Sequence, residues 1–268
     1  MAGAQAPNAS TMRPMSDPVR ERWAAGEVAL NAWSTFGGAS AASVLAATGF
    51  DAVTVDLQHG MFGLDAAIAC LQAVSATPAV PLARCRSNDL AEIGHLLDAG
   101  AYGIICPSID TPDDAARFVA ACRYPPRGRR SYGPTRAVLY GGPDYVAGAD
   151  DTVLAIGMIE SASALDHLDG ILAVDGLDAV YVGPSDLAVS NGWQAPGVGP
   201  LDRELADALV HIVTRARAAG VPTGIFAQNL DHAVQCASWG YRLITPGSDV
   251  GLLRAAAAHR IARLRRGA

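Results

Sequence analysis

The feature that most constrains the fold of this chain is an alternation, repeated eight times, of short apolar runs with longer stretches rich in Ala and Leu. The apolar runs are predicted strands, and they span residues 30–36, 52–56, 79–85, 102–108, 152–160, 178–184, 222–228 and 241–247. Most are continuously apolar, which is typical of parallel strands that are covered on both faces. The stretches between them begin near capping residues such as Asp89, Thr111 and Ser161 and often end at glycines, so they are predicted helices.

Eight β–α units in a chain of this length predict an α/β fold of the (β/α)8 TIM-barrel type, with residues 17–268 as one domain. The alternative is a doubly wound open sheet, which usually carries a Gly-rich phosphate-binding turn after its first strand; FGGAS at residues 36–40 matches such a turn poorly. Residues 1–16 have neither a charged start nor an apolar core and are predicted to be a disordered leader. Residues 124–150 are rich in Pro, Gly, Arg and Tyr and are predicted to form a long loop that serves as a lid, a binding loop or a subunit contact.

The composition argues against several classes of function. A net charge of −6 and a pI of about 5.4 disfavour binding to nucleic acid or to an anionic membrane surface. No apolar run approaches the roughly 20 residues that a membrane span requires. The five cysteines lack the spacing of a zinc site or a disulfide framework, so we expect reduced thiols in a cytoplasmic protein.

Polar and ionisable residues gather at the C-terminal ends of the predicted strands. In a parallel barrel these ends meet at one face, which is where active sites lie. The strand ends hold Asp56, Gln58, His59, Arg84, Pro107, Ser108, Glu160, Gly183, Ser185, Asp186, Gln228, Asn229 and Ser248. The sequence therefore predicts a polar site that combines carboxylates, a histidine and an arginine.

Glu160 and Asp186 are candidate metal ligands. They follow neighbouring strands, and no Lys or Arg lies beside either of them in the sequence, so the two carboxylates would repel each other at a shared site. A divalent cation removes that repulsion, and oxygen ligands without thiolates favour Mg²⁺ or Mn²⁺ over zinc. The structural alternative is that both acids pair with arginines or cap helices.

His59 and Arg84 are candidate catalytic groups. A histidine has an ordinary pKa of about 6.5 and therefore transfers protons in either direction at neutral pH. A guanidinium at a strand end is costly unless it meets an anion, and a substrate carboxylate or a developing oxyanion fits its planar fork. Asp98 lies in the last turn of a predicted helix, where the helix dipole disfavours negative charge, so we expect it to have a partner, for which a histidine is one candidate.

Several stretches of the sequence resemble one known family. They are GFDAVTVDLQHG, PLARCRSND, LLDAGAYGIICPSIDTPDDA, RYPPRGRRSYGPTRA, MIES and VDGLDAVYVGPSDLA, which occur in this order. The family is the HpcH/HpaI aldolase/citrate lyase family, and the resemblance extends from about residue 26 to residue 265. It implies a (β/α)8 barrel and a metal-dependent class II pyruvate aldolase, which cleaves a 4-hydroxy-2-oxo acid to pyruvate, or a related 2-oxo acid, and an aldehyde.

The resemblance also implies roles for the proton-transfer groups. His59 corresponds to the catalytic base, Asp98 to the acid that makes this base more basic, and Arg84 to the arginine that binds the pyruvate carboxylate and stabilises the enolate. All 20 basic residues of the chain are arginine, so a Schiff base through lysine is excluded, and with it the class I aldolase mechanism.

The resemblance further implies the groups that hold the metal and the substrate. Glu160 and Asp186 correspond to the ligands of a divalent cation, which is Mg²⁺, Mn²⁺ or Co²⁺. Gly183, Ser185 and Asp186 correspond to the segment that contacts the 2-oxo acid. Asp56 corresponds to an acid that holds metal-bound water.

Two positions depart from the heptanedioate aldolases of this family. Met158 replaces a glutamine and Gln58 replaces a glutamate, and both changes bear on which aldehyde the site accepts. One alternative is a CoA-ester lyase of the citrate lyase β-subunit or malyl-CoA lyase type, in which arginines of residues 127–136 would bind the phosphates of the coenzyme. Another alternative is a non-catalytic barrel that binds a small acid or a protein.

The last predicted helix has an apolar face and an arginine-rich face. It is commonly the helix that closes a barrel. The family resemblance implies instead that it is exchanged between subunits of a homo-hexamer, arranged as a trimer of dimers. The resemblance also implies that part of residues 124–150 reaches a neighbouring active site.

Overall fold

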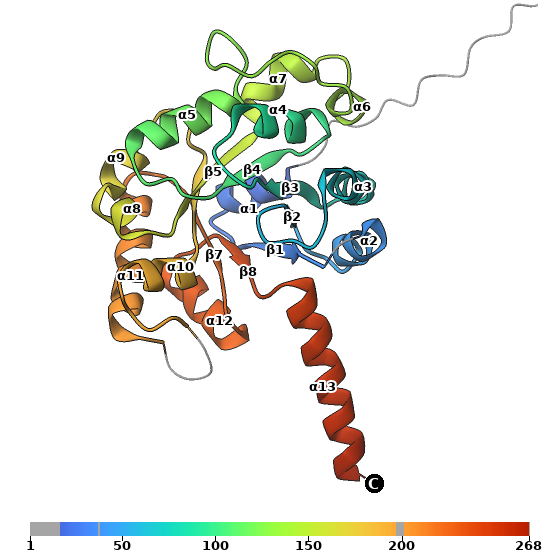
Figure 1. Cartoon of the computed structure of the whole chain (residues 1–268), viewed down its shortest axis with the longest axis vertical. Coiled ribbons are helices and arrows are strands. Elements are labelled where there is room, and N and C mark those ends of the chain that lie inside the picture. Colours follow the sequence, from blue (N-terminus) through green and yellow to red (C-terminus); the bar gives the residue numbers. More distant parts are fainter. Residues whose placement is uncertain (1–16, 37, 197–200, 268) are drawn as a thin grey trace, which may run out of the picture.

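Eight parallel strands form a closed barrel in which each strand pairs with the next and the last pairs with the first (Figure 1). This computed structural model describes residues 17–36, 38–196 and 201–267. The strands are β1 (Ala29–Ser34), β2 (Ala52–Asp56), β3 (Val80–Arg84), β4 (Gly103–Cys106), β5 (Leu154–Ile159), β6 (Ala179–Val182), β7 (Thr223–Phe226) and β8 (Leu243–Thr245). The predicted barrel is therefore confirmed, and the open-sheet alternative is wrong. The leader predicted for residues 1–16 lies outside the described residues.

Helices follow the strands and surround the barrel (Figure 1). They are α2 (Ala39–Ala47), α3 (Leu64–Ser75), α4 (Leu90–Asp98), α5 (Pro112–Cys122), α8 (Ala162–Asp166), α9 (Leu168–Leu172), α10 (Pro184–Ser190), α11 (Arg203–Ala218) and α12 (Leu230–Trp239). The side chains of Asp89, Thr111 and Ser161 each accept a hydrogen bond from a backbone N–H of the first turn, as the sequence predicted. Strands β2 to β6 are buried at every position, because the barrel interior covers one face and helices cover the other.

Residues 124–150 do not form one continuous loop. They contain α6 (Ala137–Gly141) and most of α7 (Tyr145–Thr152). Ala137 and Tyr145 are buried in the same group of core side chains as Tyr102 and Tyr124. This burial orders a segment whose composition predicted a loop.

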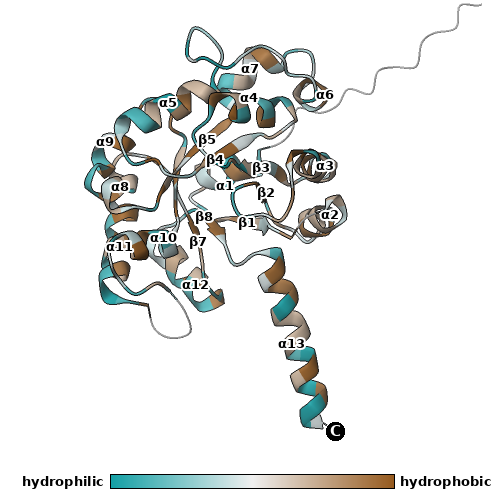
Figure 2. Cartoon of the chain, in the orientation of Figure 1, coloured by the Kyte–Doolittle hydropathy of each residue, from teal (hydrophilic) through white to brown (hydrophobic). Residues whose placement is uncertain are grey.

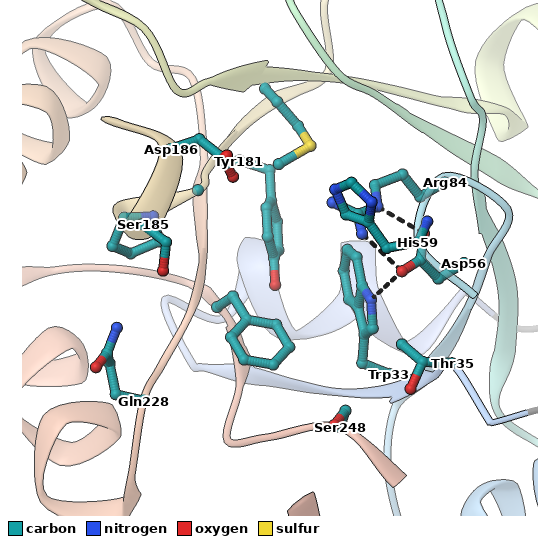
Figure 3. Close-up of a pocket in the computed structure, with 14 residues that line it drawn as sticks. Trp33, Thr35, Asp56, His59, Arg84, Tyr181, Ser185, Asp186, Gln228 and Ser248 are labelled. Carbon is teal, nitrogen blue, oxygen red and sulfur yellow. Dashed lines mark hydrogen bonds and ion pairs between the residues drawn. The ribbon is translucent and has the colours of Figure 1, made fainter. Parts of the chain in front are cut away.

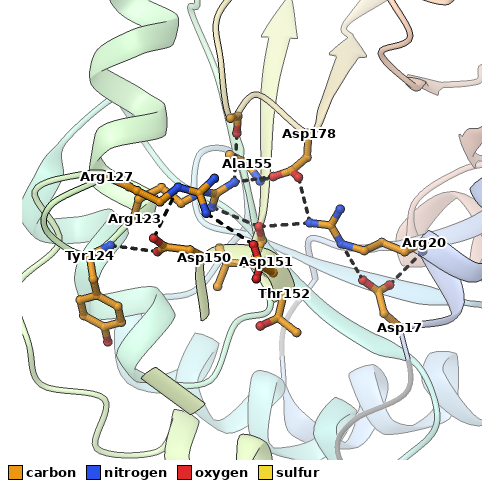
Figure 4. A network of polar contacts seen from close by, with 12 residues as sticks. Asp17, Arg20, Arg123, Tyr124, Arg127, Asp150, Asp151, Thr152, Ala155 and Asp178 are labelled. Atoms are coloured by element: carbon orange, nitrogen blue, oxygen red, sulfur yellow. Dashed lines mark hydrogen bonds and ion pairs between the residues drawn. The ribbon is translucent and has the colours of Figure 1, made fainter. Parts of the chain in front are cut away.

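A polar network and the helix α1 (Pro18–Ala24), which the sequence did not predict, cover the N-terminal end of the barrel. Asp178, just before β6, accepts hydrogen bonds from Arg20 at 2.8 Å and from Arg123 at 2.6 Å (Figure 4). The same carboxylate accepts the backbone N–H of Ala155 at 2.7 Å. The C-terminal ends of the strands remain open at the other end.

The C-terminal helix α13 (Asp249–Gly267) extends away from the barrel and has no buried residue (Figure 1). Leu253, Ile261 and Leu264 are 61%, 51% and 74% exposed, and Figure 2 shows hydrophobic positions along the helix. The predicted exchange of this helix between subunits involves a second chain and remains a prediction. Across the described residues, no helix is both long enough and apolar enough to cross a membrane.

Candidate active site

A cavity of about 370 Å³ lies at the C-terminal ends of the strands. This volume is in the range of small-molecule binding sites. Trp33, Thr35, Asp56, His59, Arg84, Met158, Tyr181, Gly183, Pro184, Ser185, Asp186, Phe226, Gln228 and Ser248 line it. Figure 3 shows Asp56, His59 and Arg84 on one side, with Ser185 and Asp186 across from them. The cavity therefore brings together six of the eight residues to which the family resemblance gives a role, and Asp98 and Glu160 are not among its lining residues.

Asp56 and Arg84 form a buried ion pair. They end the neighbouring strands β2 and β3 and are register partners, so their side chains leave the sheet side by side. Nε and Nη2 of Arg84 donate to the two carboxylate oxygens of Asp56 at 2.8 and 2.6 Å. The guanidinium also lies 4.9 Å from the ring centre of Trp33. Nη1 of Arg84 is thereby left for a ligand.

Asp56 also organises the turn that carries His59. It accepts the backbone N–H groups of Gln58 and His59 at 3.1 and 3.3 Å and the indole N–H of Trp33 at 3.2 Å. Burial favours the neutral form of Asp56, but hydrogen bonds and charge from Arg84 outweigh it, so the pKa of this carboxyl is below its ordinary value. A Cβ at Gly60 would overlap the carbonyl oxygen of Asp56, so only glycine allows the chain to turn back this closely.

Glu160 is not among the described residues that line the cavity; it lies against Gly183, which does line it, and is 8% exposed. Its Oε1 accepts the backbone N–H of Ser108 at 2.8 Å, and Ser108 presents that group from a left-handed conformation, with φ 56°. A Cβ at Gly183 would come within 2.9 Å of Oε2, so glycine at this position leaves room for the carboxylate. The structure thus uses an unfavourable backbone conformation and a glycine to hold Glu160 in place.

Burial raises the pKa of Glu160, and the charge of Asp186 raises it further against the opposing effect of the Ser108 N–H. The two acids come from the adjacent strands β5 and β6, Asp186 through the first turn of α10. A divalent cation would relieve this repulsion, so the donor set fits a hard metal ion. Among the described residues, no group of three or more His, Cys, Asp or Glu side chains has the arrangement of a metal site. A cation bound by these two carboxylates would therefore keep positions for substrate and water.

Asp98 lies outside the cavity. It ends α4, which leads into β4, so within one chain it lies at the opposite end of the barrel from His59. Its carboxylate accepts a hydrogen bond from Arg130 at 2.7 Å, and Arg130 also donates to the hydroxyl of Tyr145 at 3.0 Å. Burial raises the pKa of Asp98, and Arg130 partly offsets the effect. The partner expected for this acid is thus an arginine of the same chain, and contact with a catalytic histidine would require a second chain.

The aromatic part of the cavity was not predicted from the sequence. Trp33 stacks on Tyr181 with ring centres 5.4 Å apart and meets Phe226 edge-on at 5.7 Å. These residues belong to apolar runs that looked like ordinary core strands. Their clustering depends on which strand positions face inward once the barrel closes. Met158, noted as a departure from the family pattern, lines the same cavity.

Comparisons with known proteins show the family to which the chain belongs. The chain matches the family model described as HpcH/HpaI aldolase/citrate lyase over residues 32–256. It is 40% identical over 247 residues to a hydroxypyruvate/pyruvate aldolase of Rhizorhabdus wittichii, which covers 92% of this chain and 98% of that protein. It is 35% identical over 234 residues to a 5-keto-4-deoxy-D-glucarate aldolase of Salmonella arizonae, covering 87% of this chain and 90% of that protein.

A solved structure gives the same result. An HpcH/HpaI aldolase/citrate lyase family protein from Burkholderia cenocepacia superimposes with a TM-score of 0.86 at 33% sequence identity, covering 93% of this chain and 100% of that one. The barrel fold and these similarities all indicate the same family. The chain belongs to the HpcH/HpaI aldolase/citrate lyase family, and it is a carbon–carbon lyase of the aldolase type.

Proposed function

We propose that the protein is a divalent-metal-dependent class II aldolase that reversibly cleaves a 4-hydroxy-2-oxo acid. The products are an aldehyde and pyruvate or hydroxypyruvate, the two 2-oxo acids in the name of the Rhizorhabdus relative. The observation that carries the proposal is that Glu160, directly after β5, and Asp186, in the first turn of α10, lie beside one cavity, which Asp186, His59 and Arg84 line.

Two residues of the cavity, Arg84 and His59, have defined tasks in this reaction. Nη1 of Arg84 binds the carboxylate of the 2-oxo acid, because the other two nitrogens of the fork are held by Asp56. His59 accepts the proton of the C4 hydroxyl. The C3–C4 bond then breaks, the aldehyde leaves, and the electron pair remains on the 2-oxo acid as an enolate. Transfer of the proton from His59 to C3 of the enolate gives the 2-oxo acid and restores the neutral imidazole. In the synthetic direction His59 returns the proton to the new alkoxide.

A divalent cation held by Glu160 and Asp186 would act as a Lewis acid that stabilises the negative charge of the enolate. Mg²⁺, Mn²⁺ and Co²⁺ suit the two oxygen ligands. The decisive experiment is cleavage of a 4-hydroxy-2-oxo acid before and after treatment with EDTA. The proposal predicts that activity disappears and that each of the three ions restores it to some degree. Full turnover by metal-free protein would overturn the proposal.

The CoA-ester lyase alternative gains no support from the arginine-rich segment. Arg127 pairs with Asp151 at 3.4 Å, and Arg130 pairs with Asp98 at the N-terminal end of the barrel. These guanidinium groups therefore lie away from the cavity in this chain.

We further propose that the protein assembles as a homo-hexamer in which α13 packs on a neighbouring subunit. The uncovered apolar residues of this helix support the proposal. In such an assembly Asp98, which lies far from the cavity of its own chain, would act on His59 of a neighbour. Mixing the two inactive variants His59→Ala and Asp98→Ala before reassembly should then restore activity, because some mixed sites contain both original residues. Absence of any restored activity would show that the two residues do not act together across an interface.

We also propose a cytoplasmic location. All five cysteines are unpaired and buried, which suits a reducing compartment. Fractionation of cells of the source organism, followed by immunodetection, would test this proposal.

A further inference from the structure

Asp249 joins the start of α13 to the end of β1. Its Oδ1 accepts the hydroxyl of Thr35 at 2.8 Å, and its Oδ2 accepts the backbone N–H of Phe36 at 3.0 Å. The backbone N–H of Thr35 lies 3.1 Å from both carboxylate oxygens, and the hydroxyl of Ser34 donates to Oδ2 at 3.3 Å. Hydrogen bonds to an ionised carboxylate are stronger than those between neutral groups, so this side chain ties residues 34–36 firmly to α13.

Capping of α13 does not account for these contacts, because Ser248 performs it. The Oγ of Ser248 accepts the backbone N–H of Gly251 at 3.2 Å, and its carbonyl oxygen accepts that of Leu252 at 2.9 Å, which is the pattern of an N-cap residue. From its own helix, Asp249 accepts the N–H of Val250 at 2.8 Å, whereas its other donors in the described chain belong to residues 34–36. Most of its hydrogen-bonding capacity is therefore directed at another element.

These contacts lie at the seam where the barrel closes. Within the described residues, β1 and β8 are in register along their first two residues, and beyond them a single bridge joins Trp33 to Ser248. β2 and β3, by contrast, are in register along all five residues of each strand. The hydrogen bonds of Asp249 therefore hold β1 to the chain after β8 at the end of the seam where the ladder is interrupted.

Asp249 is not among the described residues that line the cavity, but its partner Thr35 is one of them. Thr35 lies beside Asp56 (Figure 3), and its carbonyl oxygen accepts the backbone N–H of Met61 at 2.8 Å. Met61 directly follows the turn that carries His59. A shift of Thr35 would therefore move this turn.

Trp33 connects the same seam to Arg84. Its ring centre lies 4.9 Å from the guanidinium, and its indole N–H donates to Asp56 at 3.2 Å. Trp33 also belongs to the segment of β1 that Asp249 holds, and its bridge partner Ser248 directly precedes Asp249. The carboxylate of Asp249 thus fixes the segment that supports both the histidine and the arginine of the cavity.

We infer that Asp249 is a positioning residue of the active site: by holding the end of β1, it keeps His59 and Arg84 in place. This inference rests on the proposed aldolase function. Misplacement of reacting groups by about 1 Å can slow a reaction by about 100-fold, so loss of the carboxylate should lower kcat. The metal should remain bound, because β5, which leads to one of its two ligands, lies across the closed barrel from β1.

The test is exchange of the C3 protons of pyruvate with deuterated solvent at saturating Mg²⁺, followed by NMR. In folded Asp249→Asn, kcat for exchange should be lower by about tenfold or more, because an amide nitrogen cannot accept the donors of residues 34–36. Its Mn²⁺ affinity, measured by electron paramagnetic resonance, should stay within about twofold of wild type. The exposed control Asp175→Asn should retain both values. A purely structural role would lower the free energy of unfolding but leave kcat of the folded, metal-saturated protein unchanged, and that result would overturn the inference.

Thr35→Val tests the route of the effect and decides the matter if Asp249→Asn does not fold. Valine keeps the shape of threonine but removes the hydroxyl that donates to Asp249, so kcat for exchange should fall. The double variant should be nearly as active as the slower single variant, because both changes break the same contact. Wild-type kcat in Thr35→Val, or losses that multiply in the double variant, would contradict the inference. Absence of metal-dependent exchange in the wild-type protein would contradict the proposed function itself.

Discussion

Asp56 is the residue on which the geometry of the cavity most depends. Its side chain accepts hydrogen bonds from two nitrogens of Arg84, from Trp33 and from the backbone N–H groups of Gln58 and His59. A carboxylate offers about four lone-pair positions, so these five donors fill it. The family resemblance implies that Asp56 holds metal-bound water. The contacts in this chain support a positioning role, in which one side chain orients both Arg84 and the turn that carries His59.

The variant Asp56→Asn tests this positioning role. An amide retains the size of the side chain but leaves the buried guanidinium of Arg84 without its counter-ion, so the free energy of unfolding should fall by roughly 3–5 kcal/mol. Urea unfolding of the metal-free protein measures this change. The exposed Asp65→Asn is the matched control, with an expected effect within about 0.5 kcal/mol. A variant at position 56 that is as stable as this control would contradict the role.

The residues of the site that could be predicted from the sequence are those with an ionisable side chain at the end of an apolar strand. A histidine, an arginine and two acids at strand ends are unusual because burial of charge is costly, and the structure places His59, Arg84 and Asp186 at one cavity, with Glu160 against Gly183, which lines it. Trp33 was not predicted as a residue of the site, because aromatic residues are common in strands.

At the scale of elements, the first turn of α12 contacts Gln228, which lines the cavity. Asn229 caps this helix by accepting the N–H of His232 at 2.9 Å, and Nδ1 of His232 accepts the N–H of Gln228 at 3.3 Å. The imidazole is buried and packs against Trp239. Burial lowers the pKa of His232 below its ordinary value of 6.5, because the charged form would lose its contact with water.

This lowered pKa predicts a pH dependence of stability. The unfolded chain binds the proton more readily than the folded chain, so the contribution of His232 is fully present above pH 6.5 and is lost as the pH falls through the lowered folded pKa. His232→Asn, whose carbonyl oxygen replaces Nδ1 as acceptor, should flatten this part of the profile of unfolding free energy against pH. The exposed His211→Asn should leave the slope unchanged. An identical slope in wild type and His232→Asn would show that another group is responsible.

The elements of the barrel were predictable because a strand covered on both faces needs a continuous apolar run, and the ends of the eight strands differ from the predicted ends by at most two residues. The helices α1, α6 and α7 were not predicted. They are short, and contacts distant in sequence hold them in place, such as those of Arg20 with Asp178 and of Tyr145 with Arg130. Local propensity carries little information about such elements.

At the scale of the whole molecule, α13 is the element that one chain leaves uncovered. A helix with exposed Leu253, Ile261 and Leu264 and no buried residue is poorly stabilised by its own barrel. The sequence predicted this helix and its apolar face. The residue pattern alone could not predict its direction away from the barrel, because the same pattern also suits packing on the chain itself.

Leu264→Glu tests whether this face packs on another subunit. A charge buried at such a contact should shift the assembly toward smaller species, as measured by native mass spectrometry or light scattering after gel filtration. Ala255→Glu is the matched control, because nine residues are two and a half helical turns and place it on the opposite side of α13. Wild-type protein that elutes as a monomer, or equal behaviour of the two variants, would contradict the proposed exchange.

The central claim is that Glu160 and Asp186 bind one divalent cation at the open end of the barrel. The most direct measurement is a Mn²⁺ titration followed by electron paramagnetic resonance, on wild-type protein and on Glu160→Gln, Asp186→Asn and the exposed control Asp175→Asn. The account predicts one Mn²⁺ per wild-type chain, an affinity lower by about 100-fold or more in the first two variants, and no change in the control. Wild-type affinity in Glu160→Gln and Asp186→Asn would contradict it.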